Sequence, residues 1–236
     1  MRLFYNKDLS KNDTRVIIER EESRHIVKVL RKKIGDTIYI TNGKGILFTT
    51  EIDLINKNST ELKIINNQKH NESKFSINIA VAPTKMNDRM EWFVEKSTEI
   101  GINTITSVLC EKSERKKIKV ERLEKIAISA MKQSLQFYKP NIDNLIAFDE
   151  FVKTCKSDNK FIAQCKDNNK LYLRDCELNS KTVTVLIGPE GGFSDIEIDL
   201  AEDNGFKSIS LGNTRLRTET AAIVATQLLS VFNANI

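Results

Sequence analysis

From residue 75 onward, segments with the patterns of strands and helices alternate along the chain. Short runs of mostly β-forming residues predict strands at residues 76–82, 104–110, 160–165, 182–187 and 208–211. Longer runs, punctuated by Gly101, Pro140 and Ser194, predict helices at residues 89–100, 120–138, 195–204 and 219–233. Strands that alternate with helices form a mostly parallel sheet with helices on both faces. Residues 75–236 are therefore predicted to form an α/β domain.

The first third of the chain has a different pattern. Thr37–Thr41 and Ile46–Ile55 are strand-like and flank the turn Asn42–Gly45, which predicts a hairpin. Glu61–Ile65 supplies a further strand, and the polar stretch Asn66–Lys74 contains no apolar residue and is interpreted as a linker. Residues 1–70 are therefore predicted to form a small β-barrel-like domain with one short helix.

The positive charge of the chain is concentrated in this first domain. Residues 1–74 hold 15 Lys and Arg against 10 Asp and Glu, whereas residues 75–236 hold 22 of each, so the whole net charge of +5 lies in the first third. A basic module joined to a neutral one suggests an anionic macromolecule as partner, with nucleic acid the first candidate. A solvated surface with a chance asymmetry of charge accounts equally well for these counts.

The segment Ser23–Ile34 contains five cations and no acidic residue. At helical spacing four of the cations, Arg24, Lys28, Arg31 and Lys32, share one face, and Ile26, Val27, Leu30 and Ile34 share another. This pattern predicts an amphipathic helix that ends at Gly35. A row of cations suits RNA phosphates, whose counterions are released on binding. An ordinary helix with a solvated basic face is the alternative. The candidate RNA contacts are Arg24, Lys28, Arg31, Lys32, Lys33 and, in a second basic run after the strand that ends at Cys110, Arg115.

Other features exclude several classes of protein. The longest apolar runs are too short to span a membrane, and the first residues lack the apolar core of a signal peptide. A cytoplasmic protein with reduced thiols is therefore expected. The cysteines Cys110, Cys155, Cys165 and Cys176 form no CxxC pair and only two histidines are present, so no metal site is expected.

The stretch Thr182–Ser194 is the most informative part of the chain. An apolar strand runs directly into Gly188-Pro189-Glu190-Gly191-Gly192, which holds three of the nine glycines. Glycine permits positive φ angles and a close approach of the backbone to a ligand. The loop matches neither the P-loop pattern nor the GxGxxG pattern, so a nucleotide would have to bind it in another way.

A second strand exit follows shortly afterwards. Gly212 comes after the strand at residues 208–211, Arg215 and Arg217 follow, and Thr218 is placed to cap the next helix. Ligands of parallel sheets bind beyond the carboxyl ends of the strands. Two glycine-bearing exits so close in sequence therefore predict neighbouring loops that share one pocket. Two tight turns of an ordinary α/β domain are the alternative, which either loop alone would favour.

These two motifs, Gly188–Ser194 and Leu211–Ala221, resemble the paired signature of the ribosomal RNA small subunit methyltransferase E family. The resemblance covers nearly the whole chain, and its supporting matches are Glu95–Gly101, Gln133–Ser134 and the segment from Arg24 to Asp36. The stretch Leu135–Pro140 departs from the family pattern, because many relatives carry Gly-Arg soon after the Gln-Ser pair.

The resemblance implies a fold, an activity and partners. The implied fold is a SPOUT-type parallel sheet with a deep trefoil knot, preceded by a PUA-like β-barrel domain. The implied activity is methylation of N3 of one uridine in 16S rRNA, with S-adenosylmethionine (AdoMet) as the methyl donor. A homodimer is also implied, and the substrate is either naked RNA or the assembled small ribosomal subunit. A SPOUT enzyme that methylates a ribose 2′-oxygen or another base, and a non-catalytic RNA-binding assembly factor, are the alternatives.

The resemblance also assigns residues to the site. Those expected around AdoMet are Ile187, Gly188, Glu190, Gly191, Gly192, Leu211, Gly212, Leu216 and Thr218. Arg217 is the candidate cation for the uracil oxygens, and Glu219 is a candidate base or a partner that orients the arginine. Binding of a phosphate or carboxylate is the alternative for Arg217, and an acid favoured by the helix dipole is the alternative for Glu219.

Overall fold

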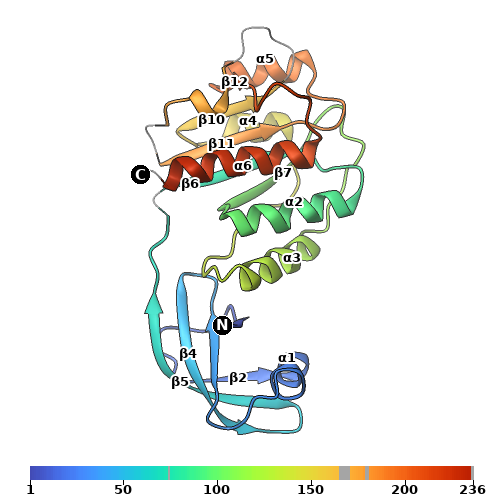
Figure 1. Cartoon of the computed structure of the whole chain (residues 1–236). Coiled ribbons are helices and arrows are strands. Elements are labelled where there is room, and N and C mark those ends of the chain that lie inside the picture. Colours follow the sequence, from blue (N-terminus) through green and yellow to red (C-terminus); the bar gives the residue numbers. More distant parts are fainter. Residues whose placement is uncertain (74, 165–170, 179–180, 235–236) are drawn as a thin grey trace. The chain divides into compact units, whose positions relative to one another are not determined.

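The computed structural model describes residues 1–73, 75–164, 171–178 and 181–234, and the chain divides into two compact units (Figure 1). The first unit comprises Met1–Glu72 and Met131–Lys139, and the second comprises Ser73–Ala130 and Pro140–Ile236. The chain thus leaves the first unit within the predicted linker and returns to it once.

The first unit contains a curled five-stranded sheet in the order β1-β3-β4-β5-β2. The strands are β1 (Leu3–Tyr5), β2 (Arg15–Glu19), β3 (Thr37–Thr41), β4 (Ile46–Ile55) and β5 (Ser59–Lys69). β1 and β3 are parallel and the other pairs are antiparallel, and β3 and β4 form the predicted hairpin. Alternate side chains point into one core, where Ile40, Phe48 and Ile52 are fully buried.

Much of the predicted linker is strand. β5 continues to Lys69, because its residues from Asn66 onward pair with residues 46–49 of β4. The side chains of this extension are exposed or half-exposed and polar, so its hydrophobicity pattern does not reveal a strand. Lys74, the end of the predicted linker, lies outside the described residues.

The helix predicted over residues 23–34 is wrong in its second half. Helix α1 (Arg20–Arg24) continues as a π-helical turn, η1 (His25–Val29), and the helical path ends there. Arg31 takes a left-handed φ of +53°. Between this turn and β3, the Gly35 N–H donates to the Ile52 carbonyl of β4 at 2.8 Å. This tertiary hydrogen bond needs a turn where the sequence pattern favours a longer helix.

Residues 131–139, which the sequence placed in the second domain, pack within the first unit. The Gly45 N–H donates to the Phe137 carbonyl at 2.9 Å, and the Tyr138 hydroxyl donates to the His70 carbonyl at 2.9 Å. A Cβ on Gly45 would overlap the Tyr138 ring, so this contact requires glycine. Helix α3 (Val120–Gln133) therefore ends before Tyr138, where the predicted helix ended.

The second unit is built on a parallel sheet in the order β12-β10-β11-β6-β7-β8, with β9 also paired to β7. All its strand pairs are parallel, which confirms the predicted α/β class. The strands are β6 (Ser76–Val81), β7 (Thr104–Leu109), β8 (Asn141–Ile142), β9 (Ile146–Ala147), β10 (Asn159–Ala163), β11 (Thr182–Ile187) and β12 (Lys207–Ile209). Cys165, the predicted end of the strand at 160–165, lies outside the described residues.

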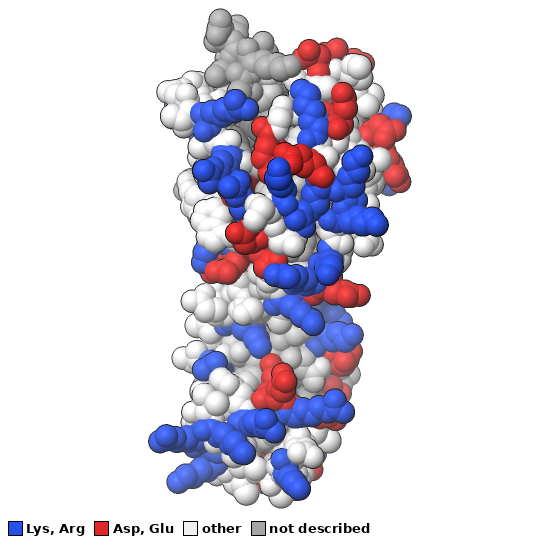
Figure 2. Space-filling model, turned by 90° about the vertical axis from the view of Figure 1, so that its right-hand side faces the viewer, with Lys and Arg blue, Asp and Glu red and all other residues white. Residues whose placement is uncertain are grey.

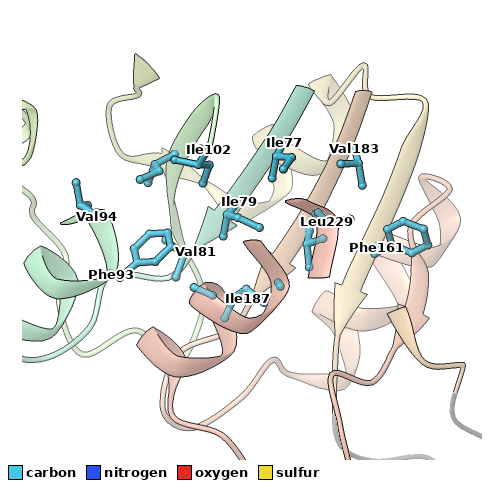
Figure 3. Packing of buried hydrophobic residues seen from close by; sticks show 14 of the residues in the cluster. Ile77, Ile79, Val81, Phe93, Val94, Ile102, Phe161, Val183, Ile187 and Leu229 are labelled. Atoms are coloured by element: carbon cyan, nitrogen blue, oxygen red, sulfur yellow. The ribbon is translucent and has the colours of Figure 1, made fainter. Parts of the chain in front are cut away.

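Helices cover both faces of this sheet. Besides α3 they are α2 (Asn87–Ile100), α4 (Phe148–Thr154), α5 (Asp195–Asp203), α6 (Thr218–Ala234) and a 3-10 turn, η2 (Leu173–Asp175). Ile79 of β6 packs in one apolar cluster with Phe93 of α2 and Leu229 of α6 (Figure 3). The next residue, Ala80, lies in a second cluster with Phe148 of α4. Successive strand residues thus face opposite helical layers.

Candidate active site

A cavity of about 550 Å³ lies at the carboxyl ends of β10, β11 and β12. β10 runs between the other two strands, and its last residue, Ala163, pairs with Ile187 on one side and with Ile209 on the other. The three strands therefore end at one level. The loops that follow β11 and β12 meet there although their strands are not neighbours.

Most of the lining of this cavity comes from the two loops and the start of α6, and the end of β10 and helix α5 supply the rest. The lining consists of Ala163, Gln164, Ile187, Gly188, Pro189, Glu190, Gly191, Gly192, Phe193, Ile198, Ser210, Leu211, Gly212, Thr214, Arg215, Leu216, Arg217, Thr218 and Ala221. All nine residues predicted to surround AdoMet are in this set, and so is Arg217. Glu219 is outside it. The cavity has the size of a small-molecule site, which is about 300–1,000 Å³ in most proteins.

Hydrogen bonds connect the two loops directly. The Thr218 hydroxyl donates to the Gly188 carbonyl at 3.0 Å, and Nη2 of Arg215 lies 3.5 Å from the Glu190 carbonyl oxygen. Thr218, expected to cap α6, is the first residue of that helix and is buried, and its hydroxyl bonds the facing loop. The predicted shared pocket is therefore present in the structure.

Two kinds of glycine shape the cavity. A Cβ on Gly188 would lie 3.1 Å from the ring of Phe193, which is itself buried, so this position has no room for a side chain. Gly192 has a left-handed φ of +71°, and no heavy atom of the described residues lies within 4 Å of where its Cβ would be. Gly212 is equally open. The first glycine serves packing, whereas the other two leave space beside the backbone.

The loop after β11 is held in place by the start of α5. Ser194 and Glu197 form a reciprocal capping box at this helix end. The buried Glu197 carboxylate also accepts the Glu111 N–H at 2.8 Å, and Nζ of Lys112 donates to the Phe193 carbonyl at 3.3 Å. The loop after β7 thus supports the cavity loop. The S-x-x-E pattern predicts the cap, but the contacts from Glu111 and Lys112 have no signal in the sequence.

Glu190 connects the cavity to the loop after β6. Its Oε1 accepts the Lys85 N–H at 3.0 Å, and its buried Oε2 has no hydrogen-bond partner among the described residues. β6 lies beside β11 in the sheet, which brings Lys85 to this position. The Lys85 side chain pairs with Glu114 at 2.8 Å, and this contact raises the pKa of the lysine. Lys85 lies in no motif of the sequence that marks it as part of this site.

Glu219 faces helix α2 instead of the cavity. Its carboxylate is buried, with an exposed side-chain fraction of 7%, and Oε1 lies 3.7 Å from Nε of Arg89. Its Oε2 is buried without a hydrogen-bond partner among the described residues. Arg89 was also missed from the sequence, because only the packing of α2 against α6 brings it near the cavity.

The predicted RNA contacts lie in both units, apart from the cavity lining. In the first unit Arg24, Lys28, Arg31 and Lys33 are exposed and Lys32 is half-buried. Arg24 lies in α1 and Lys28 in η1, whereas the other three cations lie in the turn that follows, so the five do not form the single helical face that was predicted. Figure 2 shows basic side chains gathered over the part of this unit that carries α1. In the second unit the guanidinium of Arg115 donates to the Asn87 side chain and to the Lys85 carbonyl.

Other reactive groups play no visible part in the cavity. Burial raises the pKa of the Cys110 thiol, which disfavours a reactive thiolate. Among the described residues, no group of three or more His, Cys, Asp or Glu side chains is placed to hold a metal ion. Within the same part of the chain, none of the helices combines the length and apolar character needed to cross a bilayer.

Comparison with known proteins identifies the same two parts of the chain. A family model described as an RNA methyltransferase domain matches residues 71–230, and one described as an RNA methyltransferase PUA domain matches residues 18–65. A ribosomal RNA small subunit methyltransferase E from Rickettsia conorii is 31% identical over 227 residues, which cover 95% of this chain and 92% of that protein.

Solved structures of rRNA methyltransferases are also similar to this chain. A probable rRNA-methyltransferase from Porphyromonas gingivalis is 37% identical and superposes with a TM-score of 0.91 over 100% of this chain and 99% of that chain. A ribosomal RNA small subunit methyltransferase E from Neisseria gonorrhoeae, bound to S-adenosyl methionine, is 29% identical, with a TM-score of 0.88 over 98% of both chains.

Proposed function

Since the chain belongs to the ribosomal RNA small subunit methyltransferase E family, we propose that it transfers a methyl group from AdoMet to N3 of one uridine in 16S rRNA. The observation that carries the proposal is the meeting of two glycine-bearing loops around one cavity at the ends of parallel strands. A crystallised relative from Neisseria gonorrhoeae has S-adenosyl methionine bound, which supports AdoMet as the ligand of this cavity.

The chemistry of the cavity suits this ligand. The open positions beside Gly192 and Gly212 leave space for a ligand to approach the backbone of both loops. Ile187, Leu211 and Leu216 give the lining an apolar character. AdoMet bound there supplies an electrophilic methyl group on a sulfonium. The nine predicted residues of the lining are proposed to hold it.

The protein must also make the uracil nitrogen a nucleophile. N3 of neutral uracil carries a proton, which would have to pass to solvent before the methyl group is transferred. The negative charge would then be shared by the uracil oxygens until the methyl–sulfur bond breaks and the new N–C bond forms. Arg217 is exposed at the cavity and is proposed to stabilise that charge. Glu219 lies outside the lining and opposite Arg89, so its position favours an orienting role over that of a base. Holding the base in line with the methyl group is expected to contribute most to the rate.

The two units divide the recognition of RNA. The target uridine must leave its stack to reach the cavity, so a loop or another single-stranded region is the proposed substrate. The exposed cations Arg24, Lys28, Arg31 and Lys33 of the first unit are proposed to contact phosphates. A ribosomal substrate would place the protein in the cytoplasm.

A homodimer is part of the proposal. Val224 of α6 is half-exposed and Val231 has an exposed fraction of 52%, and these two residues, seven positions apart, lie on one stripe of the helix. Such an apolar stripe is typical of a helix that packs against another surface, here a second copy. The trefoil knot implied by the family resemblance stays a prediction.

Two measurements test the proposed function. Calorimetric titration should show saturable AdoMet binding to the protein alone. The protein should then methylate small-subunit RNA from a strain that lacks the gene, and mass spectrometry of RNA fragments should place the methyl group on a uridine base. Absence of AdoMet binding would favour the assembly-factor alternative, whereas methyl transfer to a ribose or to another base would refute the assignment to uridine N3.

A further inference from the structure

A second cavity, of about 220 Å³, lies in the second unit between the start of α2, the loop before α3 and the first turns of α3. It is lined by Asn87, Met90, Glu91, Arg115, Lys117, Ile118, Lys119, Arg122 and Leu123. Figure 2 looks onto the side of the second unit where, in Figure 1, the chain passes from β7 to α3, and basic side chains gather there.

The charge of this second cavity is strongly positive. Four of its lining residues are cations and one is an acid. Arg122 is neutralised by Glu91, with Nε and Nη2 at 2.7 and 3.0 Å from the two carboxylate oxygens. Lys117 and Lys119 are exposed, and within the described parts of the chain no carboxylate oxygen lies within 4.0 Å of either Nζ. Three positive charges are thus left without a paired acid.

Arg115 adds a fixed donor to this wall. Its terminal nitrogens donate to the Asn87 side chain and to the Lys85 carbonyl, so its guanidinium is held in one place. Its Nε is buried and has no hydrogen-bond partner among the described residues. The floor of the cavity is apolar, since Met90 and Leu123 are buried. A held arginine beside free lysines is a typical arrangement for binding a phosphate group.

Two short connections join the second cavity to the AdoMet cavity. Lys85 accepts from Arg115 through its carbonyl and donates through its N–H to Glu190, which lines the AdoMet cavity. Arg89, next to Met90 of the second cavity, pairs with Glu219, which follows Thr218 of the AdoMet lining. A strand of RNA with its target base at the AdoMet cavity would therefore have the neighbouring backbone close to the second cavity.

We propose that the second cavity binds a backbone phosphate of the substrate RNA beside the target uridine. The proposal rests on the proposed function, because the AdoMet cavity defines where the target base enters. Lys117 and Lys119 supply the mobile charges and Arg115 the fixed donor. The site is distinct from the basic segment of the first unit, and it holds the part of the RNA that enters the catalytic unit.

A double substitution, Lys117→Ala with Lys119→Ala, tests the site. The matched control is Lys153→Ala with Lys156→Ala, which removes two exposed cations of the same unit that line neither cavity. Loss of the contact with this one phosphate should lower the slope of log affinity against log salt by about 0.7 for single-stranded RNA. AdoMet binding measured by calorimetry should stay unchanged. A slope equal to that of the control would overturn the proposal.

A chemical scan of the RNA locates the contact. Neutral methylphosphonate linkages are placed one at a time on either side of the target uridine in a single-stranded oligonucleotide. One linkage should weaken binding to the unsubstituted protein and have no further effect on the Lys117→Ala, Lys119→Ala variant. Equal losses in both proteins at every linkage would refute the proposal. A variant that loses affinity for assembled subunits but binds free RNA as the control does would refute it too, and would point to a ribosomal protein as the partner.

AdoMet binding and RNA methylation by the unsubstituted protein separate this proposal from the proposed function. Failure of the unsubstituted protein to bind AdoMet or to methylate RNA refutes the proposed function. If the unsubstituted protein methylates RNA and the Lys117→Ala, Lys119→Ala variant behaves as the control, only the second cavity loses its role. Substitution of both lysines by arginine keeps the charge and should retain the salt slope of the unsubstituted protein.

Discussion

The AdoMet cavity of the second unit and the basic segment of the first unit (residues 23–34) are both candidate binding regions, but they are built in different ways. The cavity is formed by backbone that leaves the ends of paired strands, so the sheet determines which loops meet. The basic segment presents long side chains from a short helix and a turn, and its charges lie at the ends of these side chains, away from the backbone. A backbone-built site is therefore rigid and intolerant of substitution, whereas a surface of cations tolerates changes in local geometry.

The largest expected effect comes from Arg217, the one charged side chain proposed to act on the target base. Arg217→Ala should lower kcat by about 10²–10³-fold, because a donor aimed at developing charge is lost. AdoMet affinity should change much less, since the loop backbone is left intact. Rates measured at saturating RNA and AdoMet, beside calorimetry, check this. Arg217→Lys keeps the charge and should recover part of the rate. An unchanged kcat in Arg217→Ala would remove the residue from the mechanism.

A smaller effect is expected from Gly188→Ala, which tests the rigidity of the cavity. The new methyl group would lie 3.1 Å from the Phe193 ring, and that ring is packed against Phe148 with centroids 5.6 Å apart. Overpacking of this kind costs about 1–3 kcal/mol of stability and displaces the loop. We expect a lower thermal midpoint and weaker AdoMet binding.

Gly191→Ala is the matched control for this substitution. Its Cβ would make an ordinary contact of 3.4 Å with the Lys112 side chain, so the loop can keep its path. It should lower the thermal midpoint less than Gly188→Ala does. Equal effects of the two substitutions would show that packing against Phe193 does not hold the loop.

Some features of the AdoMet cavity were predicted from the sequence and others were not. The strands at the cavity follow from periodicity. The meeting of the loops after Ile187 and Ile209 was predicted because two glycine-bearing strand exits lie close in sequence, and the family resemblance supplied the residues expected around AdoMet. Lys85 and Arg89 were missed, because their relation to Glu190 and Glu219 arises only when distant segments pack. Physical reasoning from one sequence finds the strands and the glycine-bearing loops that follow them, and it misses single contacts between elements.

The errors in the first unit have a related cause. The strand at Asn66–Lys69 carries polar side chains, so only its backbone pairing with β4 reveals it. The helix expected to reach Ile34 ends early because Gly35 bonds the Ile52 carbonyl of β4. In both places backbone hydrogen bonds to distant strands override the local preference. The pattern of polar and apolar side chains does not predict such backbone hydrogen bonds.

The smallest expected effect concerns Lys32 and Lys33, where the predicted helix and the observed turn give opposite results. A continuous helix would put Lys32 on the basic face and Lys33 off it. In the structure Lys33 is exposed and Lys32 is half-buried. If Lys33 contacts a phosphate, Lys33→Gln should lower the salt slope of RNA binding by about 0.7, the value for one contact with a single strand. Lys32→Gln should lower it less, and Lys57→Gln, an exposed lysine elsewhere in the same unit, controls for net charge. A larger effect at Lys32 than at Lys33 would mean that the segment becomes a longer helix when RNA binds.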